Sequence, residues 1–180
     1  MSTYAQVAAN IADKLVNTDF SSQVNDEINR AIAFYASESF YFNETTGTFN
    51  TVAGQKSYGS ADSVPTNIKQ IDSVKLTISS NNFTYLDSVS YKETEEEDSS
   101  STRGQPRKYS YYTQKFFLYP LPDAAYTVTV SYKKSYTDLS AGSDSNDFTT
   151  ITLAKDLIEA RVMKNMYAVW LDDINRAKTF

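Results

Sequence analysis

Residues 126–132 read YTVTVSY and form the most regular alternation in the chain. Large or β-branched apolar side chains at Tyr126, Val128, Val130 and Tyr132 alternate there with hydroxyl side chains. A period of two is typical of a strand with one face in a core and the other in water. This stretch therefore predicts a sheet, and the sequence on either side of it indicates how the rest of the molecule is built.

The residues that precede this strand predict a series of hairpins. Short runs of aromatic and β-branched residues are separated there by polar turns, a pattern that favours antiparallel strands. At residues 53–56 the turn contains Gly54, which can adopt a backbone conformation that other residues avoid. We expect three hairpins, formed by residues 48–52 with 57–58, 68–78 with 83–86, and 107–112 with 116–119.

Both ends of the chain predict helices instead. Apolar residues recur every three or four positions over residues 4–15, and again from residue 21 or 22 to about residue 40. This spacing indicates amphipathic helices. A polar loop over 137–147 then leads into a final helix whose apolar positions are Leu157, Ile158, Val162, Met166, Val169 and Trp170.

The apolar faces of the second and last helices need a shared partner. We expect them to form one structural core, made of Val24, Ile28, Ile32, Ile158, Val162, Met166 and Trp170. The predicted fold class is therefore α+β, with N- and C-terminal helices packed together and a β-rich, hairpin or sandwich-like insertion between them. The predicted boundaries are 1–42 and 150–180 for the helical portion and 43–149 for the insertion.

Composition excludes several kinds of chemistry. The 180 residues contain no cysteine and no histidine, so thiol nucleophiles, Cys- or His-ligated metals and the Ser-His-Asp triad are ruled out. The sequence has no glycine-rich phosphate loop and no run of about 18 apolar residues that would span a membrane. The N-terminus lacks the features of a secretory signal. We therefore expect no enzyme activity, no metal or other cofactor, and no membrane association.

The net charge of −5 argues against general nucleic-acid binding. Two charged segments nevertheless invite a functional interpretation. The first is an acidic segment at residues 93–98, which we expect to be a mobile loop after a short helical turn at 89–91; its acids are Glu93, Glu95, Glu96, Glu97 and Asp98. The second mixes the cations Arg103, Arg107 and Lys108 with Tyr109, Tyr111 and Tyr112.

Mixed basic and aromatic residues can bind single-stranded nucleic acid. Strands beside an acidic loop also need counter-charges, however, and tyrosines are common on a half-buried strand face. We favour this second interpretation of the cationic segment.

An ordered set of motifs in the middle of the chain resembles a known family. The set consists of residues 49–55 (FNTVAGQ) with Tyr58, 71–74 (IDSV), 104–106 (GQP) with Tyr109, 118–123 (LYPLPD) and 126–130 (YTVTV). Residues 28–32 (INRAI) and 171–173 (LDD) frame it. In this order the motifs resemble the head-to-tail adaptor proteins of tailed bacteriophages, also called head-completion or connector proteins, over roughly residues 20–178.

The resemblance implies a structural role in the virion. Such proteins form a ring, usually dodecameric, below the portal protein at the neck of the virion. The ring seals the packaged head and docks the tail or nozzle protein, and double-stranded DNA passes through it without sequence-specific binding. Assembly in the host cytoplasm is implied as well. Alternatives are another tail or baseplate component, or a β-sandwich module that binds carbohydrate or a host surface.

In such a ring the acidic segment has three possible roles. It could be solvated surface, it could border the DNA channel and repel the DNA backbone, or it could pair with Arg103, Arg107 or Lys108 of a neighbouring subunit. Exposed ion pairs contribute only about 0.2–1 kcal/mol each. Repeated around a ring, even such weak pairs could set the register between subunits.

Overall fold

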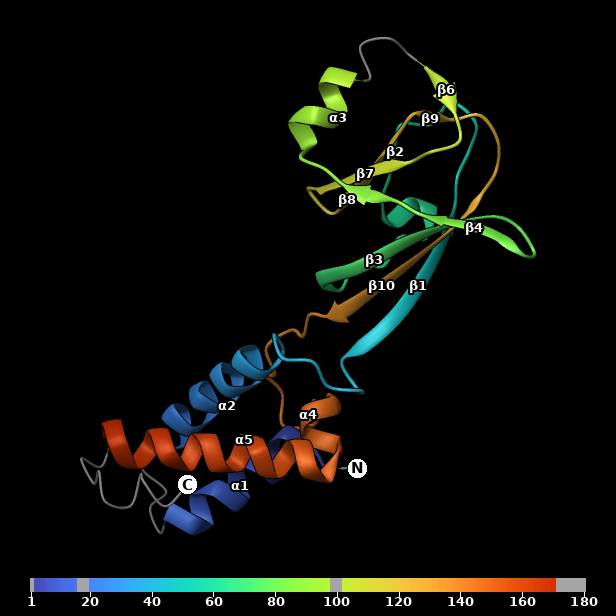
Figure 1. Cartoon of the computed structure of the whole chain (residues 1–180). Helices are drawn as coiled ribbons and strands as arrows, with labels where there is room; N and C mark the ends of the chain where they lie inside the picture. Colours follow the sequence, from blue (N-terminus) through green and yellow to red (C-terminus); the bar gives the residue numbers. More distant parts are fainter. Residues whose placement is uncertain (1, 16–19, 98–101, 171–180) are drawn as a thin grey trace. The chain divides into compact units, whose positions relative to one another are not determined.

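A computed structural model describes residues 2–15, 20–97 and 102–170 of the chain. It is a mixed α+β structure that divides into two compact units (Figure 1). One unit contains residues 1–43 and 135–180, and the other contains residues 44–134. Each unit has its own hydrophobic core.

The first unit is helical. Its elements are α1 (Tyr4–Leu15), α2 (Ser21–Tyr35), α4 (Asp147–Thr150), α5 (Thr152–Asn165) and η3, a π-helical turn (Met166–Trp170). The N-terminal helices α1 and α2 pack against α5, as the amphipathic patterns predict. The core holds Val24, Ile28, Ile32, Ile158, Val162 and Met166, all buried. The side chain of Trp170 lies outside the described residues.

Two buried glutamates also connect the helices of this unit. Glu159 of α5 accepts hydrogen bonds from Lys14 and Asn10 of α1. Glu27 of α2 accepts a hydrogen bond from the Asn165 side chain at 2.8 Å. Because a buried carboxylate is costly without partners, these contacts fix how α1 and α2 lie on α5.

The final helix differs from its predicted apolar stripe at one edge. Leu157 is only partly buried, and Val169 is largely exposed. Met163 and Tyr167 are buried instead. The π-helical turn widens the backbone spiral after Asn165, which changes the face that the following residues present. A stripe drawn with a constant α-helical period therefore fails beyond Asn165, at Tyr167 and Val169, whereas Leu157 and Met163 lie before the π-helical turn and are not explained by it.

The second helix ends earlier than predicted, at Tyr35 instead of about residue 40. The cause is Asn43, a buried side chain that donates to the Glu38 carbonyl at 2.7 Å and accepts from the Phe40 backbone N–H at 3.1 Å. These bonds hold a turn that carries Phe40 onto Phe148, with ring centroids 6.3 Å apart. Apolar residues continue beyond Tyr35 in the sequence, but the helix ends there.

The second unit consists of β-sheets. Its strands are β1 (Glu44–Asn50), β2 (Ser57–Tyr58), β3 (Ile68–Ser79), β4 (Asn82–Tyr85), β5 (Asp87–Ser88), β6 (Arg103–Gly104), β7 (Lys108–Tyr112), β8 (Lys115–Tyr119), β9 (Leu121–Pro122) and β10 (Thr127–Lys134). A 3₁₀ turn, η1 (Ser60–Asp62), and a helix, α3 (Tyr91–Glu97), complete it. Sheet A has the order β1-β10-β3-β4, sheet B the order β2-β8-β7-β5, and β6 pairs with β9.

Two of the three predicted hairpins are present, β3–β4 and β7–β8. The hairpin predicted for residues 48–58 is wrong, because β1 pairs with β10 while β2 pairs with β8 in the other sheet. Gly54 does have a positive φ of 79°. Its N–H, however, donates to the Pro122 carbonyl at 2.7 Å, which directs the chain toward sheet B.

The core of this unit lies between the inward faces of its strands. It includes Phe49 and Tyr58, whose rings lie 5.3 Å apart, and Phe116, which packs on Phe49 at 5.6 Å. The alternating residues Val128, Val130 and Tyr132 of β10 point into the same core. The strand that first indicated a sheet is thus a central strand, with neighbours on both sides.

Candidate functional site

Residues 93–97 of the acidic segment belong to a helix, α3, where the sequence predicted a mobile loop. Aromatic packing at its start provides an anchor: the Tyr91 ring stacks on Tyr112 at 4.7 Å and meets Phe117 edge-on at 4.8 Å. In its middle, the buried Thr94 hydroxyl donates to the Ser110 hydroxyl at 2.8 Å. Because these partners lie on β7 and β8, the polar sequence of residues 93–98 alone could not predict the helix.

Three of the acidic side chains have lysine partners in the same unit. Glu93 pairs with Lys108 at 3.0 Å, as the predicted counter-charge role requires. Glu95 pairs with Lys56 at 2.8 Å. The Lys56 ammonium and, next in strength, the Tyr91 hydroxyl hold the pKa of the Glu95 carboxyl below its usual range.

Glu96 has a weaker partner, Lys92, at 3.5 Å along the helix. The side chain of Glu97 and the whole of Asp98 lie outside the described residues. Sequence reasoning missed both Lys56 and Lys92 as partners. The i, i+4 spacing of Lys92 and Glu96 would have revealed their pair once a helix was assumed, whereas Lys56 is brought close only by the fold.

The two predicted arginines lie apart from these pairs. Arg103 is exposed on β6, and its guanidinium lies beside the turn at Gly54, where an added Cβ would come within 3.0 Å of it. Arg107 precedes β7, and its backbone N–H donates to the Tyr119 carbonyl at 2.9 Å. Among the described residues neither arginine has a carboxylate partner.

A shallow hollow of about 340 Å³ lies beside Arg107. Its lining combines two cations with small and aromatic residues: Gly104, Gln105, Arg107, Lys108, Tyr119 and Pro120. Because Lys108 is paired with Glu93, the hollow presents the positive charge of one unpaired arginine. This is weak for a nucleic-acid site, since such sites neutralise several phosphates.

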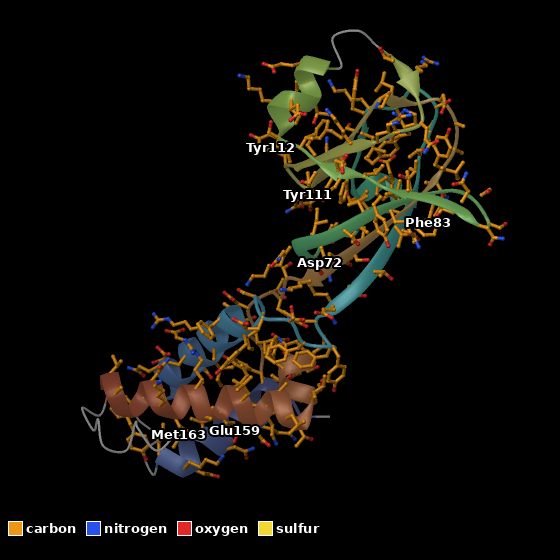
Figure 2. The ribbon with its side chains drawn as sticks, viewed as in Figure 1. Asp72, Phe83, Tyr111, Tyr112, Glu159 and Met163 are labelled. Carbon is orange, nitrogen blue, oxygen red and sulfur yellow. The ribbon has the colours of Figure 1, made fainter. Side chains whose placement is uncertain are left out.

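The tyrosines near these cations do not form a stacking platform. Tyr109 is buried, and Tyr111 packs on Phe116 at 4.8 Å. Tyr112 is exposed, but one face of its ring is covered by Tyr91. Figure 2 labels Tyr111 and Tyr112 on the same strand. The arrangement supports the interpretation of these residues as core and surface packing.

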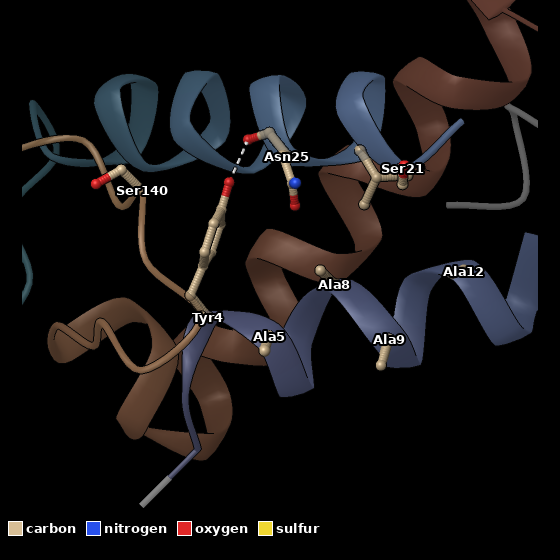
Figure 3. Close-up of a pocket in the computed structure, with 10 residues that line it drawn as sticks. Tyr4, Ala5, Ala8, Ala9, Ala12, Ser21, Asn25 and Ser140 are labelled. Atoms are coloured by element: carbon tan, nitrogen blue, oxygen red, sulfur yellow. Dashed lines mark hydrogen bonds between the residues drawn. The ribbon is translucent and has the colours of Figure 1, made fainter. Parts of the chain in front are cut away.

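The helical unit contains a second hollow, of about 360 Å³ (Figure 3). Its walls come from α1, α2 and the loop around Ser140, and the wall from α1 is rich in alanine: Ala5, Ala8, Ala9 and Ala12. The Tyr4 hydroxyl donates to the Asn25 carbonyl at 3.1 Å. Desolvation by burial raises the pKa of this hydroxyl, so Tyr4 remains protonated near neutral pH.

Further features of the described residues concern metals and membranes. No group of three or more aspartate or glutamate side chains gathers where it could hold a metal ion within residues 2–15, 20–97 and 102–170. In that same part of the chain, no helix is both long enough and apolar enough to cross a membrane.

A comparison with protein families relates nearly the whole chain to a known family. The model of the SU10 adaptor protein family matches residues 2–179. This span includes both units, the acidic helix and the motifs that frame the β-rich insertion. A search of the curated proteins finds no match.

Proposed function

The chain belongs to the SU10 adaptor protein family, and from that membership we propose that it forms a ring below the portal of a phage virion. Membership makes it a phage adaptor with a structural rather than a catalytic role. In the proposed ring, expected to be dodecameric, the protein contacts the portal protein on one side and the tail or nozzle protein on the other. Double-stranded DNA passes through the ring without sequence-specific binding.

The observation that carries this proposal is the match over residues 2–179. It includes the helical unit and the β-rich unit together. An adaptor in this position needs contact surfaces for at least two different partners. Two units with separate cores support such a role, because each can keep its shape while its surface binds a different protein.

Exposed apolar side chains also support a role in assembly. They occur in both units, and aromatic residues are enriched at protein interfaces. The helical unit exposes Phe34, Tyr41 and Leu153, and the β-rich unit exposes Phe83, Tyr85 and Tyr112.

A phage in which the gene for this protein carries a nonsense mutation tests the proposed function. Grown in a host without a suppressor, it should produce heads that package DNA but carry no tails and lose their DNA. Complete heads with defective tails would instead indicate a tail or baseplate component. Complete virions that fail to adsorb would indicate a host-binding module. Either of these two results would contradict the proposal.

A further inference from the structure

Within the described part of the chain, sheet A has two open edges. Its order is β1-β10-β3-β4, so β1 and β4 each have one neighbouring strand (Figure 1). No further backbone hydrogen bond joins residues 44–50 or 82–85 to another segment of the described chain. An open edge presents a row of unpaired N–H and C=O groups, and such a row is a template for a strand of another molecule.

The pairing of β4 with β3 determines which backbone N–H and C=O groups of β4 point toward the open edge. The Leu86 N–H donates to the Val74 carbonyl of β3 at 2.9 Å. Backbone groups alternate in direction along a strand, so Thr84 also points toward β3. The N–H and C=O groups of Phe83 and Tyr85 therefore point toward the open edge.

The pairing of β1 with β10 likewise determines which backbone groups of β1 point toward its open edge. The Thr51 N–H donates to the Tyr126 carbonyl at 2.9 Å, so Phe49, two residues earlier, points toward β10. Alternation then directs the backbone groups of Thr46, Thr48 and Asn50 toward the open edge. Their side chains are exposed, on the face opposite Phe49.

The two edges are complementary in direction and in face. All neighbours in sheet A are antiparallel, and the number of strands is even, so β4 runs opposite to β1. A β4 edge laid against the β1 edge of a second copy therefore continues the antiparallel order. It also pairs Phe83 and Tyr85, which are 55% and 60% exposed, with threonines whose side chains lie on the same face. Aromatic pairs with β-branched residues are favourable cross-strand neighbours.

Neither edge carries the features that usually prevent such pairing. Charged residues, proline and bulges protect natural edges. The sequence of β4 is NFTY, and the only charged residue of β1 is Glu44 at its start. A register shift does occur between Thr77 and Ser79, but it lies at the hairpin end and leaves the partners of Thr84 and Tyr85 in regular register.

We propose that β4 of one copy of this chain pairs with β1 of the next, which joins the sheets of neighbouring subunits. The inference rests on the proposed ring and names the contact that closes it. Head-to-tail pairing uses both edges of every copy and generates a ring when the rotation between copies closes. Pairing of β4 with a second β4 would instead leave β1 open in both copies.

Cross-linking in assembled virions tests this contact cleanly, because the chain has no cysteine of its own. The test protein carries Thr48→Cys on β1 and Tyr85→Cys on β4. Within one subunit these two positions are three interstrand spacings apart, which is about 14 Å. A short bismaleimide should therefore join them only between subunits. Each single variant is tested alone, and Thr48→Cys with Thr113→Cys, an exposed position in the turn between β7 and β8 and outside sheet A, is the matched control.

The expected result is a ladder of covalent multimers from virions with both substitutions, and monomers from the singles and the control. Virions whose ring is visible but which yield only monomers would overturn the β4-to-β1 contact and leave the ring intact. Covalent dimers from Tyr85→Cys alone would also overturn it, in favour of β4-to-β4 pairing. Wild-type virions without a ring of this protein would overturn both the contact and the proposed function.

A second variant tests the same contact without cross-linking. Tyr85→Lys adds a charge at the open edge and removes no hydrogen bond to β3. We expect a loss of ring formation on the portal, whereas Thr127→Lys, on the same face of a central strand, should form rings normally. Equal ring formation by the two variants would contradict the proposal.

Discussion

Tyr58 organises the turn between the two sheets. The side chain is fully buried, and its hydroxyl accepts a hydrogen bond from the Val52 N–H at 3.1 Å. The hydroxyl also lies within donating distance of the Val52 and Gln55 carbonyls, at 3.1 and 3.0 Å. One oxygen therefore satisfies backbone groups on both sides of the Gly54 turn.

Replacing Tyr58 with phenylalanine should lower the free energy of unfolding by about 1–3 kcal/mol, because it leaves the part-buried Val52 N–H without its acceptor. Urea titration of the purified protein measures the change. Tyr41→Phe is the matched control, since Tyr41 is 79% exposed. Equal stability of the two variants would show that the hydroxyl of Tyr58 does not hold the turn.

Tyr136 makes the stability of the helical unit sensitive to alkaline pH. Burial, and then a hydrogen bond from its hydroxyl to Asp147 at 2.8 Å, raise the pKa of Tyr136 above its usual value of about 10. Because the folded-state pKa is the higher one, its contribution is complete below pH ~10 and is lost as the pH rises.

We therefore expect the unfolding free energy of the wild type to fall more steeply from about pH 10 to about pH 12 than that of Tyr136→Phe. Urea titrations across this range measure both slopes. Equal slopes of unfolding free energy against pH for the two proteins would show that Tyr136 is not the source of the alkaline sensitivity. Tyr4, Tyr58, Tyr111 and Tyr132 also have a pKa raised by burial, so the variant should retain part of the alkaline sensitivity.

Among the helices and strands, those with a clear local sequence pattern were predicted correctly. The helix over residues 4–15, the β3–β4 and β7–β8 hairpins and the central strand β10 are all present. Each has a strong period of its own or a turn next to it in sequence. The α+β class follows from these elements and is confirmed.

The errors arose where a hydrogen bond from outside the hydrophobic pattern decides the local structure. Asn43 ends α2, and the Pro122 carbonyl directs Gly54 away from the expected return strand. For the candidate site, the sequence predicted counter-charges for the acidic segment, and the Glu93–Lys108 pair fits that expectation. It missed the helix α3 itself, because Tyr91 and Thr94 are anchored by residues of β7 and β8.

The lysine pairs of α3 favour the interpretation of this helix as charge-balanced surface. We predict that a phage with glutamine or asparagine at all five acids of residues 93–98 assembles, retains its DNA and ejects it normally. A salt series during assembly, together with an ejection assay, measures these properties. Failure of assembly only at high salt would support pairing with a neighbouring subunit, and slowed ejection with normal assembly would support a channel-facing role.

At the scale of the whole molecule, two separate cores predict separable stability. Ile158→Ala should destabilise the helical unit by about 2–5 kcal/mol, because Ile158 is completely buried there. Hydrogen exchange should then speed up in α1, α2 and α5 while β3 and β10 keep their protection. Leu153→Ala, on the same helix but 81% exposed, should change neither unit. Equal loss of protection in both units would show that they unfold as one.

The position of this protein in the virion decides whether it acts as a head-to-tail adaptor. A cryo-electron microscopy reconstruction of the virion vertex measures that position and its symmetry directly. We predict a closed ring directly below the portal, with density that fits both the helical unit and the β-rich unit and joins sheet A of neighbouring copies. Density for this protein at the tail tip, along the tail tube or on the capsid surface, with no ring at the portal, would contradict the account.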